Sequence, residues 1–413
     1  MSIIRAPFLK QGSPPASQAR AGFAMSERHS RTLLPRGRKC PILSRPGSGQ
    51  FVTNSKMRHQ SAMFVQNTCF VVGAGASCEL KLPDGNSLKR LIKTRLTTTQ
   101  QHIFVFEDAE MREAVRLLIA QSGGQREVTE SIRRAADAIR TGIDFAPSID
   151  NFLHLRQEDE WIQKVGKAAI ACCILNAESD SHLFYSGSSG RQPRGDPQRQ
   201  IRPSLGHPAL QDAWHTSLAR IAFSQVTLDE LPNALQRLEF VIFNYDRCLE
   251  QFLWLVLQSL YGIEGREAAE LLAGVNFLHP YGSLGPLPWQ DRQTAVPLGA
   301  EETDLFAIGQ GLRTFLESVD EGVASQARSM LKSASTTLFL GFGFLKQNLD
   351  LIRPAASYGS LVLGTAYGMA EANRQVAEEK SRKFADRSAY ERVFVTPVTC
   401  RALLEDFSLM LTD

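Results

Sequence analysis

The sequence has 413 residues, of which 43% are hydrophobic, and it includes 23 Phe and a net charge of +3. This apolar content can fill a large core, which excludes a mainly disordered or fibrous chain. No apolar run reaches the roughly 18–20 residues that span a bilayer. The charge is uneven, because residues 1–62 carry 11 Lys and Arg against one acid, Glu27. The remaining chain is net negative, so we expect no direct nucleic-acid binding by the folded part.

Residues 1–62 are rich in Arg, Ser, Pro and Gly without a sustained period, and we predict a disordered basic extension. Three origins are open: a translation start placed too early, a flexible arm, or an organelle transit peptide, against which the many prolines argue. Internal methionines at positions 25, 57 and 63 are compatible with a later start. We expect residues 63–413 to hold the fold.

The seven cysteines form no C-x-x-C pair, and their number is odd. This pattern argues against both a disulfide framework and a zinc ribbon. We therefore expect a reducing, cytoplasmic location and no metal.

Short β-rich runs alternate with helical patterns along the body. Strands are predicted at 68–72, 240–243, 275–278, 336–340, 360–363 and near Val393. Helical patterns occupy 86–140, 148–176, 209–223, 247–260, 369–383 and 402–411, and 179–206 is predicted to be a loop. This alternation predicts an α/β fold with a Rossmann-like, three-layer, mostly parallel sheet. Residues 86–235 would then form a helical insertion between the first and second strands.

Glycine-rich or polar motifs follow four of these predicted strands. They are Gly73-Ala74-Gly75-Ala76-Ser77, Phe243-Asn244-Tyr245-Asp246, His279-Pro280-Tyr281-Gly282-Ser283 and Gly341-Phe342-Gly343-Phe344. Taken singly, each also fits a purely structural role as a tight turn, a helix cap or a core histidine. Parallel sheets bind ligands at the carboxyl ends of their strands, so the serial placement favours one shared site.

Together with Ser148-Ile149-Asp150-Asn151-Phe152-Leu153, these motifs resemble, in order, those of the sirtuin-like (silent information regulator two-like) family. The similarity is to the branch that hydrolyses NAD in bacterial anti-phage defence, and it covers about residues 67–365. It implies an NAD-binding domain with NAD+ glycohydrolase activity, which releases nicotinamide and ADP-ribose and depletes cellular NAD+.

The resemblance also implies roles for individual residues. Asn244 would hold water and a ribose hydroxyl, His279 would act as general base, and Asp246 would orient the Asn244 loop. The residues implied in NAD binding are Gly73, Ala74, Gly75 and Ser77 at the phosphates, Asp150 near the nicotinamide, and Gly341 and Phe342 near the adenosine.

Two features depart from the family pattern. The zinc-ribbon cysteine pairs of protein deacylases are absent, and Gly85-Asn86-Ser87 replaces the Arg that follows their Pro-Asp turn. Pro280 and Tyr281 also separate His279 from the Gly-Ser pair, so either His279 or Tyr281 occupies the base position. We favour His279, because tyrosine is a poor base near neutral pH.

The leading hypothesis is therefore an NADase effector that forms a homo-oligomer and is controlled by a separate sensor protein. A HerA-like hexameric translocase ATPase or an Argonaute-type protein would be suitable sensors, and no membrane partner is expected. The alternatives are a non-catalytic sensor module that binds NAD or ADP-ribose and, less favoured, an NAD-dependent protein deacylase.

Overall fold

The computed structural model describes residues 64–99, 105–184, 203–301, 303–313, 321–356 and 359–412. The predicted extension at 1–62 and most of the predicted loop at 179–206 lie outside these residues. No helix in the described part of the chain has the length and apolarity to cross a bilayer.

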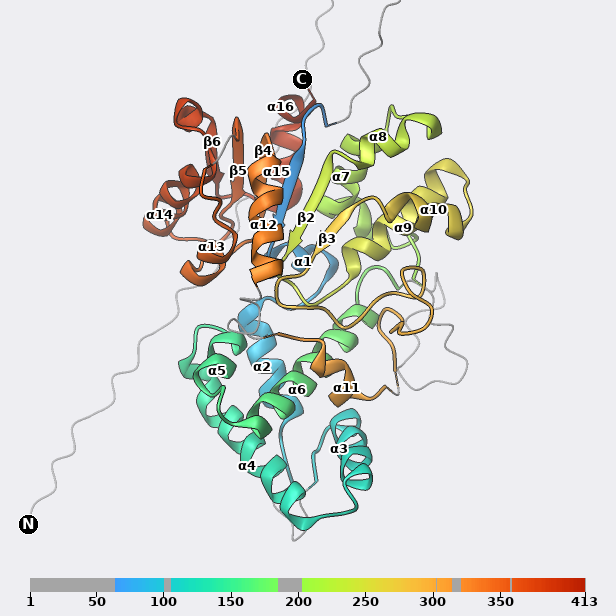
Figure 1. Cartoon of the computed structure of the whole chain (residues 1–413), viewed down its shortest axis with the longest axis vertical. Helices are drawn as coiled ribbons and strands as arrows, with labels where there is room; N and C mark the ends of the chain where they lie inside the picture. The colour runs from blue at the N-terminus through green and yellow to red at the C-terminus, as the bar shows by residue number, and fades with distance from the viewer. Residues whose placement is uncertain are drawn as a thin grey trace, which may run out of the picture. The chain divides into compact units, whose positions relative to one another are not determined.

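Six parallel strands form one sheet in the order β3-β2-β1-β4-β5-β6 (Figure 1). The strands are β1 Thr68–Val72, β2 Leu238–Ile242, β3 Asn276–Leu278, β4 Thr336–Leu340, β5 Leu361–Thr365 and β6 Val393–Thr396. This is the strand order of doubly wound dinucleotide folds, whose direction of winding reverses between the first and fourth strands. The predicted α/β, Rossmann-like class is confirmed.

The sheet is covered on both faces because its strands are apolar at successive positions. In β1, Cys69 and Val71 join one core cluster, whereas Phe70 and Val72 join the other. Beside the first face pack α12 Glu321–Ser333, α13 Lys346–Ile352 and α14 Glu371–Ser381. Beside the second pack α7 Trp214–Phe223, α8 Leu231–Leu235, α9 Cys248–Tyr261, α10 Gly265–Leu272, α15 Cys400–Asp406 and α16 Ser408–Thr412. The result is a three-layer sandwich.

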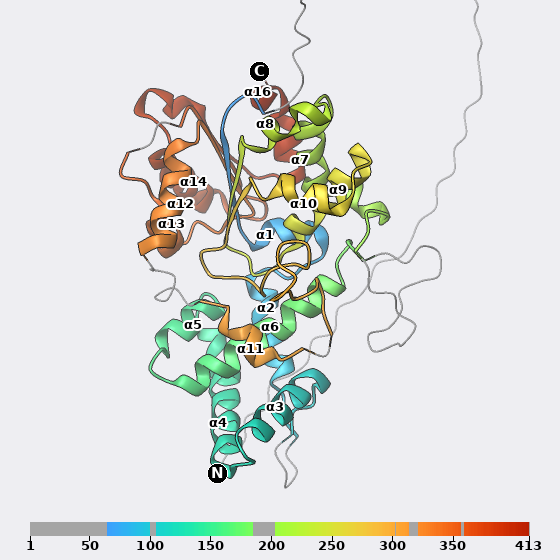
Figure 2. The same ribbon diagram turned by 45° about the vertical axis from the view of Figure 1, so that its right-hand side comes forward.

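A second group of helices lies at the carboxyl end of the strands. It consists of α2 Gly85–Arg95, α3 Ala109–Gln121, α4 Arg126–Gly142, α5 Ile149–Leu155 and α6 Glu160–Ser179. Both views show α11 Leu305–Gln310, which comes from the chain between β3 and β4, packed against α6 (Figures 1 and 2). By contrast, α7 and α8 fall within residues 86–235 but cover the sheet.

Polar caps divide two of the long helical patterns. The single helix predicted over 148–176 is two helices, because the Asp159 side chain accepts a hydrogen bond from the Ile162 amide and starts α6 there. In the same way, Asp108 caps α3 through the Met111 amide, which separates α3 from α2 within 86–140.

Candidate functional site

The loops that follow β1 and β4 are in direct backbone contact where the winding of the sheet reverses. The Gly75 amide donates to the Gly341 carbonyl at 3.0 Å. A Cβ on Gly73 would lie 2.6 Å from that carbonyl oxygen. Gly341 has a φ of +57°, and a Cβ there would lie 1.9 Å from the Ala76 amide nitrogen. These three predicted site glycines are thus required by the packing of one loop on the other, whether or not a ligand is present.

A buried hydrogen-bonded chain connects the first motif to the second. The Asn244 side-chain amide donates to the Ser77 hydroxyl at 2.7 Å and to the Gly73 carbonyl at 3.1 Å. The Ser77 hydroxyl donates in turn to Asp246 Oδ2 at 2.8 Å, and Asp246 Oδ1 accepts from the Cys248 amide at 3.2 Å. Asp246 therefore accepts a hydrogen bond from the first amide of α9 and holds Asn244 through Ser77.

The other end of the Asn244 side chain has no partner. Its Oδ1 atom is buried and accepts no hydrogen bond from any described residue. Asn244 lines a cavity of about 80 Å³, whose walls also include Ala74, Asp150, Tyr245 and Asp246. Ligand pockets usually measure about 300–1,000 Å³, so this cavity is too small for a dinucleotide. In this conformation the cavity is therefore closed to NAD+.

Two carboxyl groups of this cavity have altered acidity. Burial raises the pKa of Asp246 to about 6, and the hydrogen bond from Ser77 opposes that effect. Burial also raises the pKa of Asp150, while the hydrogen bond that Asp150 accepts from the Tyr245 hydroxyl opposes it. Carboxyl groups with raised pKa values in one cavity are typical of functional sites.

His279 lies outside this cavity, in a buried pair with Glu250 of α9. Its Nε2 atom is 2.7 Å from Glu250 Oε1, and its Nδ1 atom is 2.9 Å from the Asn244 carbonyl oxygen. Burial lowers the pKa of His279, but the Glu250 carboxylate more than offsets this, so that the pKa is raised overall. Both ring nitrogens therefore have a hydrogen-bonding partner, and the contact with the Asn244 carbonyl oxygen holds the backbone of Asn244 in place.

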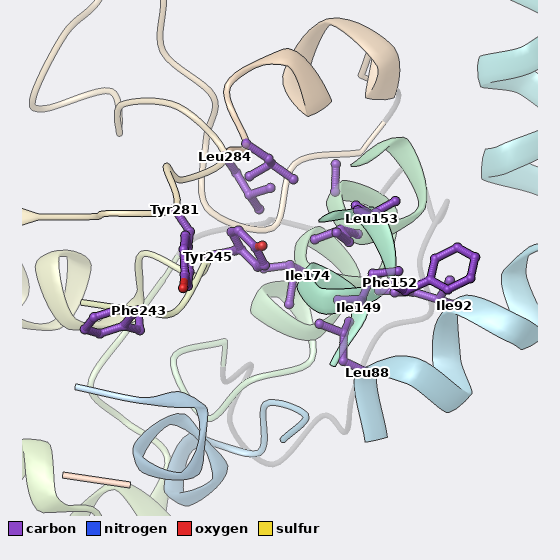
Figure 3. Packing of buried hydrophobic residues seen from close by; sticks show 14 of the residues in the cluster. Leu88, Ile92, Ile149, Phe152, Leu153, Ile174, Phe243, Tyr245, Tyr281 and Leu284 are labelled. Atoms are coloured by element: carbon purple, nitrogen blue, oxygen red, sulfur yellow. The ribbon is translucent and has the colours of Figure 1, made fainter. Parts of the chain in front are cut away.

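Tyr281, the other candidate for the base position, is buried and hydrogen-bonded to α13. Figure 3 shows it beside Phe243 and Tyr245. Its hydroxyl donates to Asn348 Oδ1 at 2.6 Å, and burial raises the pKa of that hydroxyl. The two candidates thus have different partners, and neither lines the Asn244 cavity.

Phe342 packs in an aromatic cluster, whereas the family resemblance implies that it lies near the adenosine of NAD. Its ring centroid lies 5.2 Å from that of Phe243, 5.5 Å from that of Phe339 and 5.4 Å from that of Phe344. Phe342 is buried and does not line the Asn244 cavity. The structure gives its side chain a packing role.

A buried ion pair that the sequence did not reveal anchors the same loop. Arg247 donates to both carboxylate oxygens of Glu178, at 3.1 Å from Nε and 2.7 Å from Nη2. The guanidinium also donates to the carbonyls of Gly285, Val296 and Pro297. Arg247 directly follows Asp246 and could have been suspected from the motif, but nothing distinguishes Glu178 within its helix.

The fold and the site together define an α/β protein of Rossmann-like topology with a small cavity, lined by both polar and apolar residues, at the reversal of its sheet. No protein-family model matches the sequence, and a search among curated proteins finds no match. Within the described ranges, no three His, Cys, Asp or Glu side chains are grouped in a way that could hold a metal ion.

Proposed function

We propose that this protein is an NAD+ glycohydrolase whose reaction centre is the Asn244 cavity. The single observation that carries the proposal is the free Oδ1 of Asn244, buried at the carboxyl end of β2 and fixed by Ser77 and Asp246. An unpartnered buried acceptor is costly in a folded protein and is compensated when a ligand or water donates to it. The choice of NAD+ as the substrate rests on the order of the motifs, which resembles that of the NAD-hydrolysing sirtuin-like proteins.

The reaction does not need a general acid to protonate the leaving group. The nicotinamide nitrogen is already cationic, so the ring leaves as a neutral pyridine when the glycosidic bond breaks. The enzyme must instead stabilise an oxocarbenium-like ribose and position a water for attack at the anomeric carbon. Asn244 Oδ1 can accept a hydrogen bond from that water or from a ribose hydroxyl.

Asp150 is the group of this cavity best suited to the developing positive charge. It lies on α5 and lines the same cavity as Asn244, and its carboxylate would stabilise the cation and accept the proton of the attacking water. In this proposal His279 is a positioning residue, because both of its nitrogens are engaged by Glu250 and the Asn244 backbone.

NAD+ binding requires the cavity to open. Its lining comes from separate segments of the chain, among them residues 82–85, residues 148–150 and residues 243–246. A closed resting state suits an NADase, which would otherwise deplete the NAD+ of its own cell. We propose that self-assembly or a separate sensor protein opens the site. The six described cysteines are all free, which supports a reducing cytoplasmic location.

The test is to incubate the purified chain with NAD+ over a range of protein concentrations, with and without a candidate sensor protein, and to measure nicotinamide and ADP-ribose by chromatography. Wild-type protein should release both, whereas Asn244→Ala and Asp150→Asn should lose turnover. Asn176→Ala, at a buried asparagine of α6 outside this cavity, is the matched control. Full activity in Asn244→Ala would reject the site.

A non-catalytic module that binds NAD or ADP-ribose is the second candidate. The engagement of both His279 nitrogens favours it, because no free histidine base then faces the cavity. Saturable NAD+ binding without turnover, lost in Asn244→Ala, would support this alternative. Absence of both binding and turnover would exclude both functions.

A further inference from the structure

A second, larger cavity lies on the other side of α9, away from Asn244. It has a volume of about 1,060 Å³ and is bordered by α9, α10 and the loop that contains Trp289. None of its lining residues also lines the Asn244 cavity. Its size is close to the upper end of the range of cavities that bind small molecules.

Two tryptophans give the wall of this cavity an aromatic character. The indole rings of Trp254 and Trp289 are parallel within 2°, with centroids 6.2 Å apart. Trp254 is held in place because its Nε1 donates to the Gly265 carbonyl at 2.8 Å. A Cβ on Gly265 would lie 2.7 Å from Trp254 Cζ2, so glycine is the residue that permits this approach. Parallel indoles suit the stacking of a flat heteroaromatic ring.

Gln251 provides a polar group of defined position in the same cavity. It is only 4% exposed and lines the cavity, yet its side-chain amide makes no hydrogen bond with any described residue. Its amide atoms are not among the buried polar atoms that lack a partner, so they are open to the cavity and can pair with a ligand there. A primary amide offers both a donor and an acceptor, which is the pattern that recognises the edge of a nucleobase.

The charges at the rim of the cavity favour an anionic group. Arg266 and Arg292 both line it, and Glu270 is the acidic lining residue. Glu270 accepts a hydrogen bond from Arg266 Nε at 2.9 Å, whereas Arg292 is exposed and pairs with no described carboxylate. Arginine in this setting suits phosphate, since its planar fork matches phosphate oxygens.

We infer that this cavity binds a nucleotide through its base, independently of the reaction proposed at Asn244. The base stacks on the indoles, its hydrogen-bonding edge meets the Gln251 amide, and the phosphate lies near Arg292. The larger face of a purine stacks over more of the indole surface than a pyrimidine does, so purine nucleotides are the expected class.

The test is a titration of the full chain with AMP and GMP, followed by tryptophan fluorescence and by calorimetry. CMP, adenosine and ribose 5-phosphate separate the contributions of the purine, the phosphate and the sugar phosphate. We expect saturable binding of a purine nucleotide, weaker binding of adenosine and little binding of ribose 5-phosphate. Trp289→Leu and Gln251→Leu should each weaken binding by roughly ten-fold.

Two controls keep the result interpretable. Trp161→Leu removes a tryptophan of α6 that does not line this cavity and should leave the affinity unchanged. Asn244→Ala should also leave it unchanged, so failure of the NADase proposal is distinguishable from failure of this one. Gln251→Leu removes an unpaired amide and should fold normally by circular dichroism. Absence of saturable binding, or unaltered affinity in both Trp289→Leu and Gln251→Leu, would overturn the inference.

Discussion

Asn244 and Ser77 are 167 positions apart in sequence, yet the amide of one donates to the hydroxyl of the other at 2.7 Å. The bond joins the loop after β2 to the short helix α1, Ala74–Ser77, which follows β1. Because Ser77 also donates to Asp246, one hydroxyl sets the orientation of both polar residues of the Asn-Tyr-Asp motif. Serine at the end of the glycine motif therefore positions both of these polar side chains.

Replacing this serine tests whether the orientation of Asn244 matters. If the proposed NADase reaction is correct, Ser77→Ala should lower kcat for nicotinamide release by roughly 10- to 100-fold, because a misplaced group near the reacting atoms costs about that much. The KM for NAD+ should change less, since no direct contact with substrate is removed. Ser381→Ala, at a buried serine whose hydroxyl bonds only within its own helix, is the control. Equal kcat in both variants would contradict the assignment.

The buried Asp246 carboxyl should make stability depend on pH. Its pKa is raised from 3.8 to about 6, so the folded state holds this proton more tightly than the unfolded state does. The resulting stabilisation is fully present below about pH 3.8 and is lost as the pH rises through about 6. The difference in pKa corresponds to about 3 kcal/mol in the free energy of unfolding.

The side chain introduced by Asp246→Asn cannot ionise. Between pH 4 and pH 7 the free energy of unfolding of this variant should therefore rise relative to that of the wild type by about that amount. Urea denaturation of both proteins at several pH values measures the gain, and other titrating groups cancel in the difference. A constant difference between the two proteins across this range would show that Asp246 does not titrate there.

The His279–Glu250 pair gives a second pH-dependent prediction of the same sign. The side chains are only 11% and 3% exposed, so removing one partner leaves a buried group unpaired. Glu250→Gln and His279→Gln should each lose about 3 kcal/mol of stability at pH 5.5. The double variant should lose less than the sum, because the charge is then absent from both sides.

Because the pKa of His279 is raised, the contribution of the pair is fully present below its ordinary value of 6.5 and is lost as the pH rises through the folded-state pKa. The cost of Glu250→Gln should consequently shrink between pH 5.5 and pH 8.5. A double-mutant cycle at both pH values gives the coupling energy, and an unchanged coupling would count against a charged histidine.

Gly341 and Gly343 belong to the same motif but should respond differently to alanine. A Cβ at Gly341 collides with the backbone of Ala76 and demands a positive φ, so Gly341→Ala should cost roughly 3 kcal/mol or more. At Gly343 the nearest atom to an added Cβ is Leu345 Cγ at 4.0 Å, and alanine should cost less than about 1 kcal/mol. Chemical denaturation of the two variants provides the comparison, and similar losses in both would refute the packing role of Gly341.

The positions of the strands could be predicted because their signal is local. The continuous apolar run Thr336–Leu340 is a buried strand in a parallel sheet, as expected from its residues alone. The prediction of one continuous helix over 148–176 is wrong, because the apolar periodicity continues across the break between α5 and α6. Only the capping geometry of Asp159 decides that a new helix starts there.

The polar residues of the site could be predicted as a group but not in their individual contacts. The motif order brought Ser77, Asn244 and Asp246 together correctly, since the carboxyl ends of β1 and β2 meet. The partners Glu250 and Glu178 were missed, because each is one charged residue in a helix and its burial depends on packing between distant segments. Whether His279 or Tyr281 faces the reaction centre also depends on the path of a turn, which spacing does not determine.

The clamp of Glu178 on Arg247 has a consequence for the loop between Gly285 and Pro297. That loop contains no strand or helix, and its carbonyls at 285, 296 and 297 all accept hydrogen bonds from the guanidinium of Arg247, the residue directly before α9. Its shape is therefore imposed from outside. A graft of this segment into another scaffold would not keep the Trp289 geometry unless the arginine and its carboxylate were transplanted with it.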